Sequence, residues 1–309
     1  MRCIKCAHKA SVELRRHHSA YCPPHYLEFV RNQVARNIKR LKMFTQQERI
    51  LVAVSGGKDS LALWDLLLEA GYSASGLHIH LGIGDYSVRS AQTTRAFADE
   101  RKAELIEFDL ERELGLGVPE LSKVLKRAPC SGCGLNKRYF FNKIALDRGF
   151  DVVATGHNLD DEAATLLGNV LHWQHDSLSR QSPVLERTHP KLVKKVKPLY
   201  SLTEREMASY CLLKGIDYME EECPNATGAH SLLYKDVLNR IEFESPGSKQ
   251  QFLQGFLDRF RPLLQANDTT ELRECAVCGQ ATTSEICSFC RMRDRAKRHV
   301  EPAPINRNF

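Results

Sequence analysis

The sequence lacks any apolar run close to the ~20 residues that a helix needs to cross a bilayer. Its first residues also lack the hydrophobic segment that directs secretion. We therefore expect a cytoplasmic protein with no membrane partner. A reducing cytosol disfavours disulfides, so the 11 cysteines in 309 residues indicate metal sites or catalysis instead. Ten of these cysteines fall into three groups.

The sequence also lacks a strong excess of charge of either sign. The formal net charge is +6, and it falls further if metals bind, because metal binding requires thiolates. Global charge therefore indicates little about partners. Local basic runs are often only solvated faces, but three of them in a chain with metal modules favour a polyanion such as RNA. The runs are Arg36, Lys39, Arg40 and Lys42; Lys194, Lys195 and Lys197; and Arg291, Arg293, Arg295, Lys297 and Arg298.

A glycine turn joins an apolar run, Ile50 to Val54, to a helical pattern that begins near Leu61. Its sequence is Ser55-Gly56-Gly57-Lys58-Asp59-Ser60, which does not have the spacing of a Walker loop. A strand that leads through glycines into a helix directs free backbone N–H groups and the positive helix end at an anion. The turn therefore predicts a phosphate-binding loop.

Strand-like and helix-like patterns alternate after this loop, which predicts an α/β fold with a parallel sheet and helices on both faces. Ligands of such sheets bind at the carboxyl ends of the strands, so the turns after Val54 and Thr155 should face one crevice. The expected strands are Ile50 to Val54, Ala74 to Leu81, Ala103 to Leu110 and Asp151 to Thr155; the expected helices are 59–70, 88–101, 134–147 and 160–171.

The rest of the chain divides into smaller parts. Residues 172–203 are polar and contain prolines, so a mobile loop is expected there, and helical patterns return at Thr203 to Leu213, Ser231 to Phe243 and Lys249 to Leu264. The expected domains are an N-terminal zinc finger at 1–27, a linking helix at 28–48, a catalytic domain at 49–271, a zinc ribbon at 272–295 and a disordered tail at 296–309.

Two cysteine groups have the spacing of structural zinc sites. Their four-ligand sets leave no open position for chemistry, although redox disulfides or iron–sulfur clusters remain alternatives. His8, His17 and His18 compete with His25 as the fourth ligand of the first set. The sets are Cys3, Cys6, Cys22 and His25, and Cys275, Cys278, Cys287 and Cys290.

The third group is Cys130, Cys133 and Cys223, the last of which precedes a proline. Three cysteines without a fourth are typical of an incomplete iron–sulfur ligand set, which would leave one iron open to an exogenous sulfur. A thiol–persulfide pair that resolves as a disulfide, or structural thiols, are the alternatives. Cys211 lies in an apolar pattern and is expected in the core.

Together, these motifs resemble the tRNA 2-thiouridine synthetases, the TtuA group of sulfurtransferases among the PP-loop ATP pyrophosphatases. The similarity covers Leu51 to Leu67, His78 to Gly84, Cys130 to Tyr139, Ala154 to Ala163, Glu222 to Asn225, Ser231 to Lys235 and Cys287 to Met292. The resemblance implies an adenine nucleotide alpha-hydrolase-like sheet flanked by two zinc modules. It also implies thiolation of a tRNA uridine at C2, at the T-loop ribothymidine, by an enzyme that forms AMP and pyrophosphate.

The resemblance also implies the cofactors and partners, which are ATP, Mg²⁺, a [4Fe–4S] cluster, two Zn²⁺, tRNA, a ubiquitin-like sulfur carrier with a C-terminal thiocarboxylate, and a second copy of the chain. In this scheme Asp59 binds Mg²⁺, Asp161 binds Mg²⁺ or orients the uridine, and Lys137 neutralises the α-phosphate. The residues assigned to ATP are Ala53, Val54, Ser55, Gly56, Gly57, Lys58, Asp59, Ser60, Ile79, Lys137, Gly156 and Asp161; the cluster ligands are Cys130, Cys133 and Cys223.

Several alternatives stay open. Asp161 can be an ordinary residue of a helix start, and Lys137 an ordinary solvated lysine. The same chemistry can act on the anticodon wobble uridine, or through a persulfide on Cys130 or Cys133 without a cluster. Nitrogen-transfer chemistry of the same superfamily would leave the lone cysteines without a purpose. An RNA-binding zinc protein with a vestigial nucleotide fold is the remaining alternative.

Overall fold

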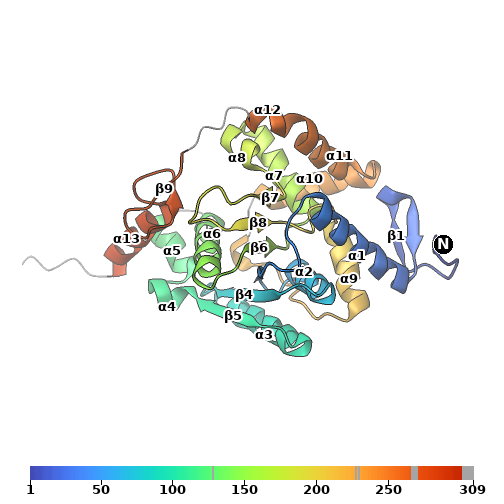
Figure 1. Cartoon of the computed structure of the whole chain (residues 1–309), viewed down its shortest axis with the longest axis horizontal. Coiled ribbons are helices and arrows are strands. Elements are labelled where there is room, and N and C mark those ends of the chain that lie inside the picture. The colour runs from blue at the N-terminus through green and yellow to red at the C-terminus, as the bar shows by residue number, and fades with distance from the viewer. Residues whose placement is uncertain (127–128, 227, 229, 266–270, 301–309) are drawn as a thin grey trace, which may run out of the picture.

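A six-stranded sheet forms the centre of the computed structural model, which describes residues 1–126, 129–226, 228, 230–265 and 271–300 (Figure 1). The strand order is β5-β4-β3-β6-β8-β7, and every neighbouring pair is parallel except β7 and β8. The predicted parallel sheet is confirmed. Its strands are β3 (Ile50–Val54), β4 (Ala74–His80), β5 (Leu105–Asp109), β6 (Val152–Thr155), β7 (Val184–Leu185) and β8 (Lys194–Val196).

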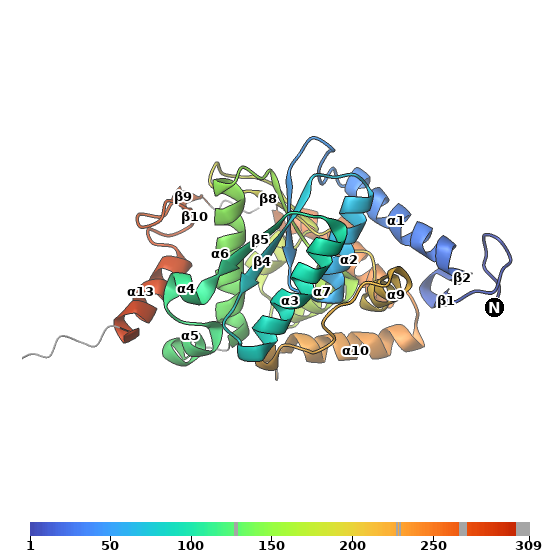
Figure 2. The same ribbon diagram turned by 90° about the horizontal axis from the view of Figure 1, so that it is seen from below.

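The sheet separates two hydrophobic cores because successive side chains of a strand point to opposite faces. In β3, Ile50, Val52 and Val54 join one core and Leu51 joins the other. Figure 2 shows α6 and α13 on one side of the sheet and α2, α3 and α9 on the other. The helices of the domain are α2 (Lys58–Glu69), α3 (Gly84–Arg101), α4 (Leu110–Leu114), α5 (Val118–Leu125), α6 (Pro129–Asp147), α7 (Leu159–Leu171) and α9 (Glu204–Lys214).

The segment 172–203 is not the loop that the sequence predicted. It contains α8 (His175–Arg180) and the strands β7 and β8, and β8 extends the parallel sheet beside β6. The expectation failed because β8 is only three residues long and reads as a basic run, although its Val196 is buried. Further helices pack on α7 and α8. They are α10 (His230–Glu244), α11 (Ser248–Gly255) and α12 (Arg261–Gln265), with η3 (Phe256–Phe260) between the last two.

The N-terminal module is fastened to the domain by a long helix, α1 (Pro23–Arg40), which follows β1 (Val12–Leu14), η1 (Arg15–His17) and β2 (Ser19–Tyr21). This helix begins at Pro23, inside the predicted finger, and not at residue 28, because a proline is well tolerated in a first turn. The Tyr26 hydroxyl donates to the Glu206 carbonyl at 2.7 Å, and the buried Arg16 pairs with the Glu206 carboxylate at 2.6 Å. The module therefore packs firmly on α9.

The C-terminal module lies at the other end of the molecule, as Figures 1 and 2 both show. It comprises β9 (Arg273–Glu274), β10 (Ala281–Thr282) and α13 (Ser288–Val300). The predicted disordered tail is wrong for residues 296–300, which continue α13; residues 301–309 lie outside the described residues. No helix in the described ranges combines the length and the apolar character that a bilayer crossing requires.

Candidate active site at the carboxyl edge of the sheet

A cavity of about 390 Å³ lies at the carboxyl ends of β3, β4 and β6. The sequence predicted that the turns after β3 and β6 would share one crevice, and they do. The walls include most of the predicted ATP residues and two of the predicted cluster cysteines: Ala53, Val54, Ser55, Gly57, Asp59, Ser60, Ile79, Lys137, Gly156, Asp161, Cys133 and Cys223. The residues Gly56, Lys58 and Cys130 were also assigned to the site but do not line this cavity.

The glycine loop is held in shape by the first turn of α2. The Ser60 hydroxyl donates to the Gly57 carbonyl at 2.9 Å and accepts from the Ser55 N–H at 3.1 Å. Gly56 has a φ of +71°, and a Cβ at this position would lie 2.8 Å from the Ser90 carbonyl oxygen. Only glycine fits there. The loop therefore presents the start of α2, with its free N–H groups, to the cavity.

Gly156 lets the turn after β6 lie directly against this loop. A Cβ at Gly156 would lie 2.8 Å from the carbonyl carbon of Asp59 and 2.9 Å from the Ser60 nitrogen. The sequence predicted this glycine for the approach of ATP, and it does line the cavity. The structure adds a second reason, because the main chain after β6 meets the first turn of α2 here.

Five charged side chains form a chain of ion pairs beside the cavity. The Lys58 ammonium lies 2.6 Å from Glu204 Oε1 and 3.3 Å from Asp59 Oδ2. Lys235 lies 3.3 Å from the other oxygen of Glu204 and 2.6 Å from Asp161 Oδ1. Lys58 is thus engaged by a carboxylate of α9, which explains its absence from the cavity wall.

Sequence reasoning missed Glu204 and Lys235. They come from α9 and α10, far along the chain from the glycine loop. The only available signal was that Lys235 ends one of the stretches of family similarity. Nothing in a single sequence indicates that Glu204 reaches Lys58, since the contact depends on how α9 packs on α2.

The surroundings shift the pKa values of the two cavity carboxyls, Asp59 and Asp161, in opposite directions. Burial raises the pKa of Asp59 to about 6. The negative charges of Asp161 and Glu204 also raise this pKa, whereas the Lys58 charge and a hydrogen bond from Asn158 lower it. Burial also pushes the pKa of Asp161 upward, but Lys235 outweighs it and holds the pKa below its ordinary value. Both carboxyls are therefore ionised at neutral pH, and Asp59 is the one that a moderate fall in pH would protonate.

Asp161 is an ordinary helix-start residue and also faces the cavity, and its predicted role toward Mg²⁺ or the uridine stays a prediction. Its carboxylate accepts from the Asn158 N–H at 3.1 Å, while its own N–H donates to Asn158 Oδ1, so the two residues form a capping box at the start of α7. It also lines the cavity. Lys137, on the inner side of α6, lines it as well.

Two of the three lone cysteines, Cys133 and Cys223, line the cavity, and Cys130 lies near both. The first turns of α6 carry Cys130 and Cys133, earlier than the expected helix start at 134, and Cys223 precedes η2 (Pro224–Ala226). The Cys130 thiol donates to the Asn225 carbonyl at 3.4 Å. Burial raises the pKa of Cys130, and negative charge on Cys133 and Cys223 raises it further.

This set of donors fits an iron–sulfur cluster with an incomplete protein ligand set. Two of the three sulfurs line the cavity, and no other cysteine of the described ranges does. Thiolates at the start of a helix are stabilised by its positive end. Cys211, by contrast, is a buried residue of α9, and burial raises its pKa to about 12, so its predicted place in the core is confirmed.

In each predicted zinc set, one ligand atom from each of the four residues lies within 4.8 Å of the others. Cys6 Sγ lies 3.6 Å from Cys22 Sγ, and Cys278 Sγ lies 3.7 Å from Cys287 Sγ. A tetrahedron with ~2.3 Å zinc–sulfur bonds has an edge of about 3.8 Å, so both sets suit zinc.

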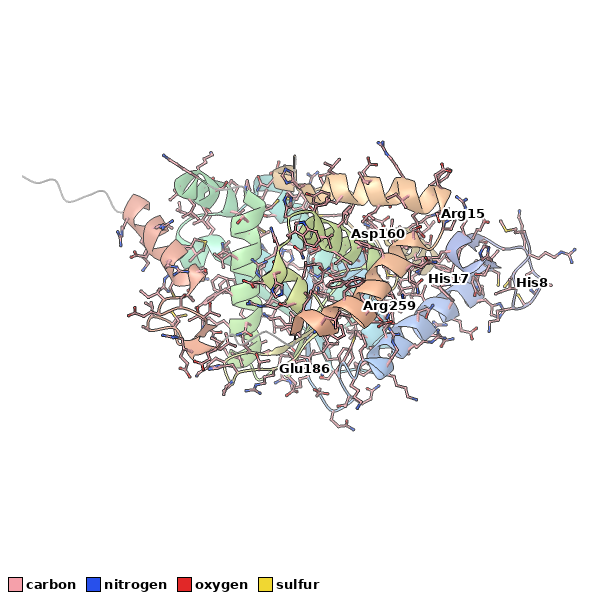
Figure 3. All side chains as sticks on the ribbon, turned by 90° about the horizontal axis from the view of Figure 1, so that it is seen from above. His8, Arg15, His17, Asp160, Glu186 and Arg259 are labelled. Atoms are coloured by element: carbon pink, nitrogen blue, oxygen red, sulfur yellow. The ribbon has the colours of Figure 1, made fainter. Side chains whose placement is uncertain are left out.

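His25 is the histidine placed to complete the first set, with its Nδ1 3.2 Å from Cys22 Sγ and 3.5 Å from Cys3 Sγ. The competing His8 lies 3.2 Å from Cys6 alone. Figure 3 shows His8 at the outer tip of the module and His17 on its inner side, toward the domain.

The comparisons with known proteins agree with this site. The family model described as a PP-loop domain matches residues 30–230. A protein of Thermus thermophilus named tRNA-5-methyluridine(54) 2-sulfurtransferase is 54% identical over 97% of this chain and 94% of its own length. A protein of Thermotoga maritima with the same name is 42% identical over 98% of this chain and 100% of its own.

A solved structure is similar as well. The U34-tRNA thiolase NcsA from Methanococcus maripaludis, determined with its [4Fe-4S] cluster, superposes with a TM-score of 0.82 at 25% identity. The superposition covers 94% of this chain and 95% of that one. The similarity therefore includes both terminal modules as well as the sheet.

Proposed function

This chain belongs to the PP-loop family of tRNA 2-sulfurtransferases, and on that premise we propose that it adenylates the C2 oxygen of a tRNA uridine and replaces that oxygen by sulfur. The substrate is the 5-methyluridine at position 54 of the T-loop. The relatives that are 54% and 42% identical carry this position in their names. The wobble uridine of the structural relative is the alternative position.

One observation carries this function: a single cavity unites the glycine loop with Cys133 and Cys223. A nucleotide site alone would serve many adenylating enzymes, including those that transfer nitrogen. Thiols beside the nucleotide site are needed only if the activated atom receives sulfur. The cavity therefore favours thiolation over the other reactions of the superfamily.

The first step is adenylation. The C2 oxygen of uridine is a poor leaving group, so it attacks the α-phosphorus of ATP and pyrophosphate departs. The loop and the start of α2 hold the β- and γ-phosphates, and Asp59 with Asp161 provides oxygen ligands for Mg²⁺. Lys137, on the cavity wall, neutralises charge that develops on the α-phosphate.

The second step is sulfur transfer. A hydrosulfide attacks C2, the carbon–sulfur bond forms, and AMP departs with the original oxygen while the sulfur loses its proton. Cys130, Cys133 and Cys223 would hold a [4Fe–4S] cluster. When bound, this cluster supplies an iron without a protein ligand, at which inorganic sulfur can be kept. The sulfur comes from the C-terminal thiocarboxylate of a ubiquitin-like carrier protein.

The remaining assignments complete the proposal. Two Zn²⁺ ions stabilise the terminal modules, one bound by the four-residue set that contains Cys3 and one by the set that contains Cys275. Four protein ligands leave no open position on either ion for a reactant. We place the protein in the cytoplasm, where its cysteines stay reduced. The family resemblance alone supports the proposal that it forms a homodimer.

The test is thiolation of purified tRNA by anaerobically reconstituted protein with ATP and sulfide, followed by mass spectrometry of RNase fragments. Cys133→Ala should abolish 2-thiolation while ATP binding stays measurable, and the buried Cys211→Ala serves as the matched control. Thiolated fragments should map to the T-loop; anticodon fragments would support the alternative position. Full activity of Cys133→Ala would refute the cluster role, and a bound persulfide on Cys130 or Cys133 without iron would support the persulfide mechanism.

A further inference from the structure

The last basic run of the chain lies beside the cysteine pair of α6. A hollow of about 90 Å³ is lined by Arg291 and Arg295 of α13 and by Ser131 and Gly132 of α6. Ser131 and Gly132 are the two residues between Cys130 and Cys133. Two exposed guanidinium groups therefore border the turn that carries the predicted cluster ligands.

These two arginines are not used to hold the fold together. Within the described ranges, the Arg291 guanidinium donates only to the Ser288 hydroxyl, at 3.3 Å, and the Arg295 guanidinium has no hydrogen-bond or ion-pair partner. The basic run of β8 differs in this respect. Lys194 pairs with Glu186 at 3.4 Å and Lys197 with Glu162 at 2.7 Å, so that run neutralises carboxylates of the domain itself.

The helical period sorts the cations of α13 onto two flanks. Phe289, Met292 and Ala296 are buried. At 100° per residue, Arg291 and Arg295 project from one side of this buried stripe and Lys297 from the other. We call Arg291 and Arg295 the arginine flank. Lys297 offers a matched cation on the same helix that does not border the hollow.

The arginine flank is held rigidly against the catalytic helix. The ring of Phe289 stacks on Tyr139 of α6 with a centroid separation of 3.6 Å, and Asn136 donates to the Met292 sulfur at 3.7 Å. The same helix carries Lys137 into the cavity. A group bound at the arginine flank is thus fixed in position relative to the reacting atoms.

The chemistry of this surface favours a nucleic-acid partner over a protein. Helix α13 carries five cations and a single carboxylate, Asp294. The exposed Lys123 of α5 and Lys126, the residue that caps α5, lie next to it. Among the side chains of α13 that the structure describes, none is a large exposed apolar one. Protein interfaces centre on such apolar groups, whereas a phosphate backbone needs cations, and the guanidinium fork suits phosphate oxygens.

We propose that the arginine flank binds the phosphate backbone of the substrate tRNA next to the uridine that enters the cavity. The inference rests on the proposed function, since it takes tRNA as the substrate. It assigns to the C-terminal zinc ribbon the task of presenting this surface beside Cys130 and Cys133.

The test measures binding of fluorescent tRNA to the full-length, metal-loaded protein between 50 and 300 mM KCl. Arg291→Ala and Arg295→Ala should each weaken binding about tenfold, as expected for the loss of a charge-assisted contact. Each should also lower the slope of log affinity against log salt by about one. Lys297→Ala should bind within about twofold of the unchanged protein. Iron, zinc and ATP binding should stay the same in all variants, which shows that they fold.

The outcomes separate this inference from the proposed function. If the unchanged protein fails to bind or thiolate tRNA, the proposed function is wrong. If it does both and Arg291→Ala/Arg295→Ala binds tRNA as Lys297→Ala does, only the present inference is wrong. If the double variant binds tRNA normally and uses inorganic sulfide normally but loses sulfur transfer from a carrier protein, the surface serves a protein partner and the RNA assignment is overturned.

Discussion

Lys58 and Glu204 form an ion pair of 2.6 Å between the glycine loop and α9. If Lys58 binds phosphate as proposed, the phosphates of ATP and the Glu204 carboxylate compete for the same ammonium group. Both side chains are partly exposed, so the competition is moderate.

Glu204→Gln should consequently strengthen ATP binding about two- to fivefold, because the neutral amide releases Lys58 to the phosphates. Isothermal titration calorimetry with ATP and Mg²⁺ measures this directly. Glu244→Gln, at the exposed end of α10, is the control. Weaker binding by Glu204→Gln would mean that the pair positions Lys58 for phosphate and does not compete with it.

Lys235→Met should shift the acid limb of the thiolation pH profile to higher pH. Lys235 holds the pKa of Asp161 below its ordinary value against the upward effect of burial, so the carboxyl without this partner takes up a proton at a higher pH. Single-turnover rates between pH 5 and 8 measure the shift. Lys143→Met, an exposed lysine paired with Asp147, removes the same charge and should leave the profile unchanged. An unshifted limb in Lys235→Met would exclude Asp161 as the titrating group.

Asp59→Asn should stabilise the protein at pH 7 by about 1–3 kcal/mol when no nucleotide is added. Burial raises the pKa of Asp59 to about 6, so between about pH 4 and 6 the folded protein binds this proton more tightly than the unfolded chain. Protonation of Asp59 therefore stabilises the folded protein fully below the pKa that Asp59 has in the unfolded chain, and this stabilisation is lost as the pH rises through 6. The amide of Asp59→Asn cannot ionise, so the variant keeps this stabilisation at pH 7.

Thermal unfolding of Asp59→Asn at pH 5 to 8 measures this difference, which should shrink toward low pH. Asp99→Asn, on the exposed end of α3, is the control. Destabilisation by Asp59→Asn at every pH would show that the ion pair with Lys58 contributes more than the burial of the charge costs.

Gly156→Ala should destabilise the protein by about 1–3 kcal/mol and weaken ATP binding, because its Cβ would lie 2.8 Å from the Asp59 carbonyl carbon. Two main-chain segments would have to separate at the glycine loop. Gly255→Ala in α11 meets no atom within 4 Å and should be neutral or stabilise by about 0.5–1 kcal/mol. Chemical denaturation and ATP titration of both variants test the contrast; equal behaviour would contradict the packing argument.

Cys287→Ser should reduce the zinc content by one ion per chain, because the second set loses one of its four thiolates. The loss should also lower iron retention after reconstitution, since Phe289 packs on the helix that carries Cys130 and Cys133. Elemental analysis measures both metals, with Cys211→Ala as the control. Unchanged iron in Cys287→Ser would show that the ribbon and α6 are independent.

The sequence predicted those parts of the site that local chemistry determines. The strand, glycines and helix start at Ser55 to Ser60 form the loop because neighbouring residues set its backbone conformation. The zinc sets were visible because cysteine spacing fixes how two ligands meet one ion. Cys223 was grouped with Cys130 and Cys133 because it precedes a proline, as cysteines of iron–sulfur ligand sets often do. The structure places Cys133 and Cys223 on the cavity wall and Cys130 near both.

Contacts between distant elements could not be predicted. Glu204 reaches Lys58 only because α9 packs on α2, and Arg295 borders Gly132 only because α13 packs on α5 and α6. The strand β8 was missed because three residues carry too little periodicity, although burial of Val196 decides its place in the sheet. These features depend on tertiary packing, which a single sequence does not record.

The stacking of Phe289 on Tyr139 means that the C-terminal ribbon cannot be treated as a detachable accessory. Helix α6 has Cys133 and Lys137, which we propose take part in the reaction, at the cavity and carries this aromatic contact as well. Truncation or exchange of the ribbon would therefore displace cavity residues that the ribbon itself does not contact. Loss of catalysis in such chimaeras would then reflect this displacement and not the removal of a reactive group.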